Sequence, residues 1–112
     1  MPLFKILTNT NLSDKKAFVK RASAEIAAIL GKSEQYVMVI LLPKQELFFS
    51  GSYEPAMYVE LKSIGLPADK TKTITAAIME FLQKETGIPP SRIYIEFTDV
   101  QRQWWGWNSD TM

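Results

Sequence analysis

The chain contains no histidine and no cysteine, so it lacks the two side chains that most readily titrate near neutral pH. Apart from these, only the α-amino group has a reference pKa close to neutrality. Met1 is followed by Pro2, and aminopeptidases commonly remove an initiator methionine that precedes a small residue. We therefore expect the mature chain to begin at Pro2, whose secondary amine sits on a rigid ring. This amine is the first candidate for acid–base chemistry.

Tryptophans cluster near the end of the chain, in the segment Trp104-Trp105-Gly106-Trp107 that follows Arg102. Such a cluster can stack on aromatic substrates or on nucleic-acid bases. The charge balance disfavours nucleic acid, because 13 basic residues stand against 12 acidic ones. We expect at least one tryptophan to lie in a subunit contact and at least one to form an apolar wall that suits an aromatic substrate.

The composition narrows the class of protein. A length of 112 residues with 46% hydrophobic residues predicts a single domain over residues 1–112. Without Cys or His, a metal would need carboxylates alone, and the sequence shows no such cluster, so we expect no metal and no other cofactor. No signal-peptide pattern is evident, so we expect a cytoplasmic protein, or one secreted without a signal peptide, that binds no membrane and no nucleic acid.

The elements that must position these residues follow one plan twice. The first half predicts a strand, a helix with one apolar face, and a strand without polar alternation. These elements are expected over Leu3–Thr8, over Asp14–Leu30 with Ser13 as the cap and Gly31 as the stop, and over Tyr36–Leu42. A further short strand is expected at Leu47–Phe49, before the turn around Gly51.

The second half repeats this order at one constant offset, which pairs Gly31 with Gly87 and Val37 with Ile93. Its expected elements are a strand over Met57–Ser63, a turn over Ile64–Pro67, a helix over Ala68–Thr86 and a strand over Arg92–Thr98. Residues 1–50 and 51–112 thus form an internal repeat of two βαβ units. We predict an α/β (α+β) fold in which two helices cover one face of a four-stranded sheet.

The run Val37–Leu42 has no polar side to present to water. Two helices cover only one face of a four-stranded sheet, so the other face needs a further cover. We infer an obligate oligomer whose sheets pack inward, and a monomer with a ligand on that face satisfies the same pattern.

Several collinear segments resemble one known family. They are Met1-Pro2-Leu3-Phe4, Gly31-Lys32, Ser52-Tyr53-Glu54-Pro55-Ala56, Ser63-Ile64-Gly65, Arg92-Ile93-Tyr94-Ile95 and Gly106-Trp107-Asn108. In these segments, which span nearly the whole chain, the sequence resembles the macrophage migration inhibitory factor and D-dopachrome tautomerase family of the tautomerase superfamily. The resemblance implies a homotrimer in which the sheets line a central barrel and the helices lie outside.

The resemblance also implies roles for individual residues. Pro2 matches the catalytic N-terminal proline, and Lys32 matches the residue that binds the substrate carboxylate. Ile64 matches a position whose backbone lines the site. Tyr94 matches a tyrosine that the neighbouring subunit supplies, and Trp107 falls in the Gly-Trp-Asn ending near the pocket mouth.

Other positions depart from the family pattern. Glu96 stands where animal members usually have Asn, and Trp105 replaces a smaller aliphatic residue, so both are candidates for altered substrate binding. Glu96 either points into the pocket, where it opposes carboxylate substrates, or pairs with Arg102 on the surface. Ala56 and Val59 occupy the positions of a cysteine pair, so we expect no thiol-oxidoreductase activity.

Each site candidate also has a purely structural interpretation. Pro2 suits the start of an edge strand, and Lys32 suits the end of a helix, where a cation complements the dipole. Tyr94 suits a core or interface, and Ile64 suits a turn.

The favoured function is keto–enol tautomerisation of phenylpyruvate-type or dopachrome-type acids, with Pro2 as the general base. The alternative is a cytokine-like interaction protein that binds a receptor and has only incidental tautomerase activity. Hydration, dehalogenation or decarboxylation of small unsaturated acids is a third class. It is disfavoured because family members of that class carry additional arginines, whereas the only ones here are Arg21, Arg92 and Arg102.

Overall fold

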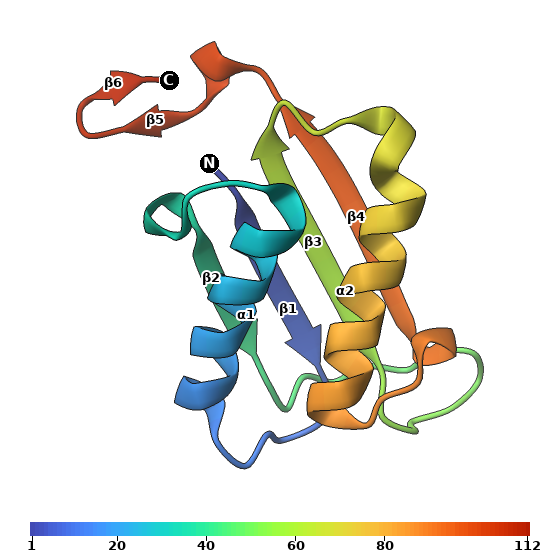
Figure 1. Ribbon diagram of the computed structural model, residues 1–112. Coiled ribbons are helices and arrows are strands. Elements are labelled where there is room, and N and C mark those ends of the chain that lie inside the picture. The colour runs from blue at the N-terminus through green and yellow to red at the C-terminus, as the bar shows by residue number, and fades with distance from the viewer.

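A mixed four-stranded sheet with strand order β2-β1-β3-β4 forms the centre of the computed structural model, which describes residues 1–112 (Figure 1). Its strands are β1 (Leu3–Thr8), β2 (Met38–Leu42), β3 (Met57–Ile64) and β4 (Ile93–Val100). β1 pairs parallel with β2 and antiparallel with β3, and β3 pairs parallel with β4. β1 and β3 are therefore central, and β2 and β4 are the two open edges.

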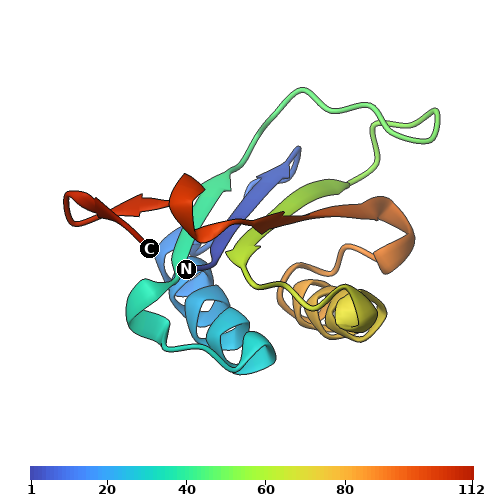
Figure 2. The same cartoon turned by 90° about the horizontal axis from the view of Figure 1, so that it is seen from above.

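Two helices, α1 (Lys15–Leu30) and α2 (Thr71–Thr86), lie side by side on one face of this sheet (Figures 1 and 2). Apolar side chains at helical spacing face the sheet and are buried there: Phe18, Ala22 and Ile26 on α1, and Ile74, Ile78 and Leu82 on α2. They pack with alternate residues of the central strands in one core cluster. The predicted α+β fold, with two helices covering one face, is confirmed. Neither helix has the length and apolar character needed to cross a membrane.

The helix starts differ from the predictions. Asp14, not Ser13, caps α1, because its Oδ1 accepts a hydrogen bond from the Ala17 amide at 3.0 Å. α2 begins at Thr71, since Ala68–Lys70 forms a separate 3₁₀ turn. The predicted stop of α1 is correct, because Gly31 adopts a left-handed conformation with φ 64°.

Several predicted strand boundaries are wrong as well. Tyr36 lies in the 3₁₀ turn Glu34–Tyr36 and Arg92 lies in the turn Pro90–Arg92, so β2 and β4 begin after these turns. Ile64 is the last residue of β3 rather than a turn residue. The expected strand at Leu47–Phe49 is absent, and a single bridge between Phe49 and Ser52 stands in its place.

The end of the chain folds into a small hairpin that lies close to the N-terminus (Figures 1 and 2). A 3₁₀ turn over Arg102–Trp104 leads into β5 (Gly106–Trp107) and β6 (Asp110–Thr111). Asn108 and Ser109 connect these strands with φ values of 53° and 65°, as a tight two-residue hairpin turn requires. The hairpin brings the predicted tryptophan segment to the end of the sheet where β1 begins.

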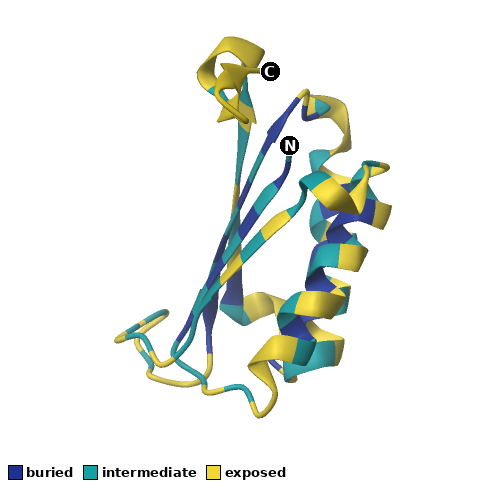
Figure 3. Cartoon of the chain, turned by 90° about the vertical axis from the view of Figure 1, so that its left-hand side faces the viewer, coloured by how far each residue is buried: buried dark blue, intermediate teal, exposed yellow.

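The sheet face that is turned away from the helices remains open (Figure 3). Across its middle, strand pairing aligns one row of four residues: Ile40, Lys5, Glu60 and Glu96. On the edge strand β2, Met38 is 61% exposed and Ile40 is 38% exposed. The apolar strand β2 was predicted to need cover on both faces. Within a single chain, only the face that is turned toward the helices is covered.

Candidate active site

Pro2 lies at the end of the sheet where β1 and β2 begin and β3 ends. It is less than 2% exposed, and its carbonyl accepts a hydrogen bond from the Met38 amide at 2.9 Å. β2 and β3 flank the strand that follows Pro2. Pro2 therefore precedes a central strand and not an edge strand, unlike in its structural interpretation.

Lys32 reaches the same end of the sheet from the last turn of α1. The left-handed conformation of Gly31 turns the chain away from the helix axis. The Lys32 Nζ then donates a hydrogen bond of 2.9 Å to the carbonyl of Ile64, at the end of β3. Its side-chain bond thus goes to the sheet rather than to the last carbonyls of α1.

Two cations and partial burial act on the amine at the start of the chain. Burial, followed by the charges of Lys32 and Arg102, lowers the pKa of the Met1 α-amino group below its ordinary value. All three effects favour the neutral amine, which is the form that accepts a proton. Arg102 was not among the predicted site residues, because only the path of the C-terminal segment brings it to the amine.

Aromatic residues stand beside this group. The Trp107 ring meets the Tyr36 ring edge-on, with 5.7 Å between the centroids. Trp107 is 51% exposed and Trp105 is half-buried, whereas Trp104 is 77% exposed. The hairpin thus carries an apolar surface with open faces to the start of the chain.

Tyr94 does not meet Pro2 within the chain. Strand pairing sets Thr98 of β4 level with Leu3, through Lys62 of β3. Tyr94 comes four residues before Thr98, at about 3.3 Å per residue along the strand. Its ring is 64% exposed and packs against Phe49, with 4.7 Å between the centroids.

Glu96 lies on the open face, opposite Glu60 in the strand pairing. Burial and then the carboxylates of Glu60 and Glu96 raise the pKa of Tyr58, which places all three groups together. The surface pair of Glu96 with Arg102 is not formed, since the one ion pair present joins Arg21 to Glu85. Glu96 faces the same side of the sheet as Tyr94, two residues away.

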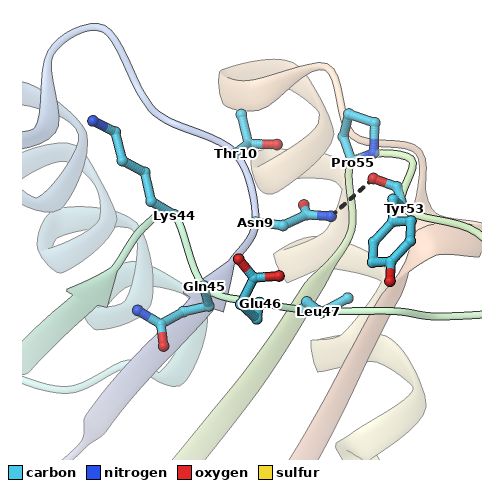
Figure 4. Close-up of a pocket in the computed structure, with 8 residues that line it drawn as sticks. All are labelled: Asn9, Thr10, Lys44, Gln45, Glu46, Leu47, Tyr53 and Pro55. Carbon is cyan, nitrogen blue, oxygen red and sulfur yellow. Dashed lines mark hydrogen bonds between the residues drawn. The ribbon is translucent and has the colours of Figure 1, made fainter.

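A polar hollow of about 290 Å³ lies at the opposite end of β1, between the loop after β1 and the loop after β2 (Figure 4). Asn9, Lys44 and Glu46 line it, and it contains none of the predicted site residues. The candidate site is therefore the end with Pro2, Lys32 and Ile64, which holds the amine and its cations.

This arrangement of fold and site agrees with one family. The sequence model of the family described as macrophage migration inhibitory factor (MIF) matches residues 1–112. The chain belongs to the MIF family. It is 38% identical to the macrophage migration inhibitory factor homolog of Brugia malayi, an alignment that covers 99% of this chain and 98% of that protein.

Solved structures of MIF homologues share the fold over their full length. The homologue from Prochlorococcus marinus superposes with a TM-score of 0.91 at 38% identity, covering 97% of each chain. The protein from Trichinella spiralis superposes with a TM-score of 0.93 at 33% identity, covering 98% of this chain and 99% of that one. The family predicted from the sequence motifs is thus confirmed.

The structure also explains two of the MIF-family motifs as parts of one clasp. Arg92 donates hydrogen bonds to the carbonyls of four residues in the loop that precedes β3: Phe49 at 2.6 Å, Ser52 at 3.4 Å, Glu54 at 2.7 Å and Pro55 at 3.3 Å. Asn9 Nδ2 donates to Tyr53 and Glu54 of the same loop. The segment Ser52–Ala56 is therefore held from both sides, which its sequence alone did not indicate.

Proposed function

We propose that this MIF-family protein is a keto–enol tautomerase of small aromatic keto acids, of the phenylpyruvate or dopachrome type. Its general base is the Pro2 amine, set free when Met1 is removed. The observation that supports this most strongly is the environment of the Met1 amine, the group adjacent to Pro2, where burial, Lys32 and Arg102 all favour the neutral form.

The proposed step moves one proton from carbon to nitrogen. The Pro2 nitrogen takes a proton from the carbon beside the substrate carbonyl. The electron pair of that C–H bond forms the C=C bond of the enol, and the carbonyl oxygen takes a proton from water. The protonated amine then gives its proton to the hydroxide that remains, which restores the neutral base and the water molecule. The ring restricts the motion of the amine, so its lone pair keeps one direction.

Lys32 is the proposed partner of the substrate carboxylate. An ammonium group has three donors, and the Ile64 carbonyl takes one of them. Two donors remain for a carboxylate, while the bond to Ile64 holds the group in place. The faces of Tyr36 and Trp107 left open by their edge-on contact suit the aromatic ring of such a substrate.

A homotrimer completes the proposed site. The open sheet face, with Met38 and Ile40 exposed, and the two unpaired edges β2 and β4 favour association. Tyr94 lies far from Pro2 in its own chain, so it reaches an active site only as a residue of a neighbouring subunit. There it donates a hydrogen bond to the enol oxygen, and Glu96 approaches with it.

Substitution of Pro2 by Gly tests the proposed base. The variant keeps a free terminus but replaces a rigid secondary amine with a flexible primary one. We expect kcat/KM for phenylpyruvate to fall by about 100-fold or more, the usual contribution of a positioned general base. The assay uses protein whose intact mass shows that Met1 is absent.

Pro90→Gly is the matched control, because Pro90 lies in the turn before β4, far from the amine. It should keep the wild-type rate. A Pro2→Gly enzyme with wild-type kcat/KM would reject Pro2 as the base. An inactive wild-type protein with a free Pro2 would reject the tautomerase and favour a binding function.

A further inference from the structure

Asp99 makes an unusual contact for an exposed residue of the edge strand β4. Its Oδ1 accepts two hydrogen bonds, from the Gly65 amide and from the Leu66 amide, each at 3.0 Å. Both amides belong to the turn that leaves β3, and Gly65 adopts a φ of 73° there. Asp99 lies opposite Ser63 in the strand pairing, so the carboxylate reaches over the end of β3 to hold this turn.

The first of these bonds has a direct consequence for Lys32. The Gly65 N–H and the Ile64 carbonyl belong to one planar peptide group, in which they point in opposite directions. Asp99 accepts the N–H at 3.0 Å and Lys32 Nζ donates to the carbonyl at 2.9 Å. A carboxylate, a peptide group and an ammonium group thus form one chain, in which each bond polarises and strengthens the next.

We propose that Asp99 is the positioning residue of this site, because it fixes the Ile64–Gly65 peptide that holds the Lys32 ammonium beside the N-terminal amine. The role of Lys32 in binding the substrate carboxylate rests on the proposed function. The effect of Asp99 on the position of the peptide and of Lys32 is independent of that function. Without the carboxylate, the Gly65 N–H loses its acceptor, and the peptide plane beyond the pairing of Ile64 with Val100 is less restrained, so the acceptor of Lys32 is less firmly held.

Kinetics with two substrates distinguish positioning from a general loss of structure. Asp99→Ala should raise the KM for dopachrome about tenfold, the worth of one hydrogen bond to a charged group, with kcat little changed. The KM for dopachrome methyl ester, which has no carboxylate charge, should change less than twofold. Asp99→Asn should restore wild-type values, because the single accepting oxygen is also present in the amide. Asp69→Ala, at another exposed carboxylate, is the matched control.

Equal losses with the acid and the ester would overturn the proposal, as would an Asp99→Asn enzyme as impaired as Asp99→Ala. Asp99→Ser, whose hydroxyl is too short to hold both amides, replaces the alanine variant should that variant fail to fold.

A spectroscopic measurement tests the same contact without any enzymatic activity. An ammonium group held by a carbonyl exchanges its protons slowly, so Lys32 should give its own ¹H–¹⁵N signal, assigned by its loss in Lys32→Arg. We expect this signal to persist in Asp99→Asn and to vanish in Asp99→Ala. Its persistence in Asp99→Ala would overturn the proposal. An inactive wild-type protein that shows the expected spectra would reject the tautomerase alone.

Discussion

At the scale of single residues, the proposed chemistry of this chain depends on the surroundings of one amine. A free α-amino group in water has a pKa of about 7.7–8.0. Burial and the charges of Lys32 and Arg102 each lower the pKa of the terminal amine. Pro2 is the adjacent residue and is less than 2% exposed, so we expect its own amine to meet the same cations after Met1 is removed. The proposed base therefore needs no histidine, since the surroundings of the amine already favour its neutral form.

The pH dependence of the reaction follows from this environment. kcat/KM should rise with pH as the amine loses its proton, and should level off above the amine pKa. Because that pKa is lowered, the plateau should begin at a lower pH than an exposed α-amine allows. Lys32→Ala removes one cation, so it should raise the pKa and move the rise to higher pH.

The measurement is a pH–rate profile with an ester substrate, so that carboxylate binding does not interfere. Lys72→Ala removes an exposed lysine of α2 and should leave the profile unchanged. A Lys32→Ala profile that coincides with the profile of Lys72→Ala would show that Lys32 does not act on the amine.

At the scale of elements, a single arginine joins the start of β4 to the loop that precedes β3. The Arg92 guanidinium donates hydrogen bonds to four carbonyls. It also lies over the Phe49 ring, with 5.0 Å between its central carbon and the ring centroid. Phe49 in turn packs against Tyr94. The clasp therefore sets the position of the residue proposed to complete a neighbouring site.

Replacement of Arg92 tests the clasp. Arg92→Ala should lower the free energy of unfolding by about 2 kcal/mol, because the half-buried carbonyls of Phe49 and Ser52 lose a charged donor. Arg92→Lys should recover only part of this, since an ammonium group lacks the planar fork that reaches several acceptors. Urea denaturation measures both values.

Arg21→Ala is the control for the loss of a surface guanidinium, because Arg21 is exposed and pairs only with Glu85. Its effect should be much smaller than that of Arg92→Ala. Full recovery of stability in Arg92→Lys would show that charge alone, rather than the fork geometry, holds the loop.

At the scale of the whole molecule, the two faces of the sheet differ. The helices bury one face, while the other presents Met38 and Ile40 beside the charged residues Lys5, Glu60 and Glu96. Exposed apolar side chains on an open edge strand are costly for a solitary chain. The proposed trimer would remove that cost by covering this face and the two sheet edges.

Light scattering at micromolar concentration should therefore give three times the chain mass of 12.8 kDa. Ile40→Lys places a charge within the apolar part of the open face, and we expect it to yield monomers. Those monomers should also be inactive, since each would lack the Tyr94 of a neighbour. Ala76→Lys, on the exposed side of α2, should remain trimeric. A wild-type monomer would contradict the trimer.

Much of the fold was predictable because it depends on local periodicity. Apolar residues at spacings of three and four indicated both helices and the faces they bury, and Gly31 indicated where α1 ends. Most errors lie at element starts, at Ser13, Tyr36, Ala68 and Arg92, apart from the end of β3 at Ile64 and the absent strand at Leu47–Phe49. At those points a cap or a short 3₁₀ turn replaces the regular period, and such turns leave no repeating pattern in the sequence.

By itself, the sequence determined the α+β class, the family, and the amine as the first candidate base, since composition and collinear motifs carry that information. Only the tertiary structure decided that Arg102 joins Lys32 near the amine, that Asp99 holds the turn after Ile64, and that Tyr94 lies away from Pro2. These placements depend on strand register and on the path of the C-terminal hairpin. Both arise from pairing between distant segments, which no local spacing encodes.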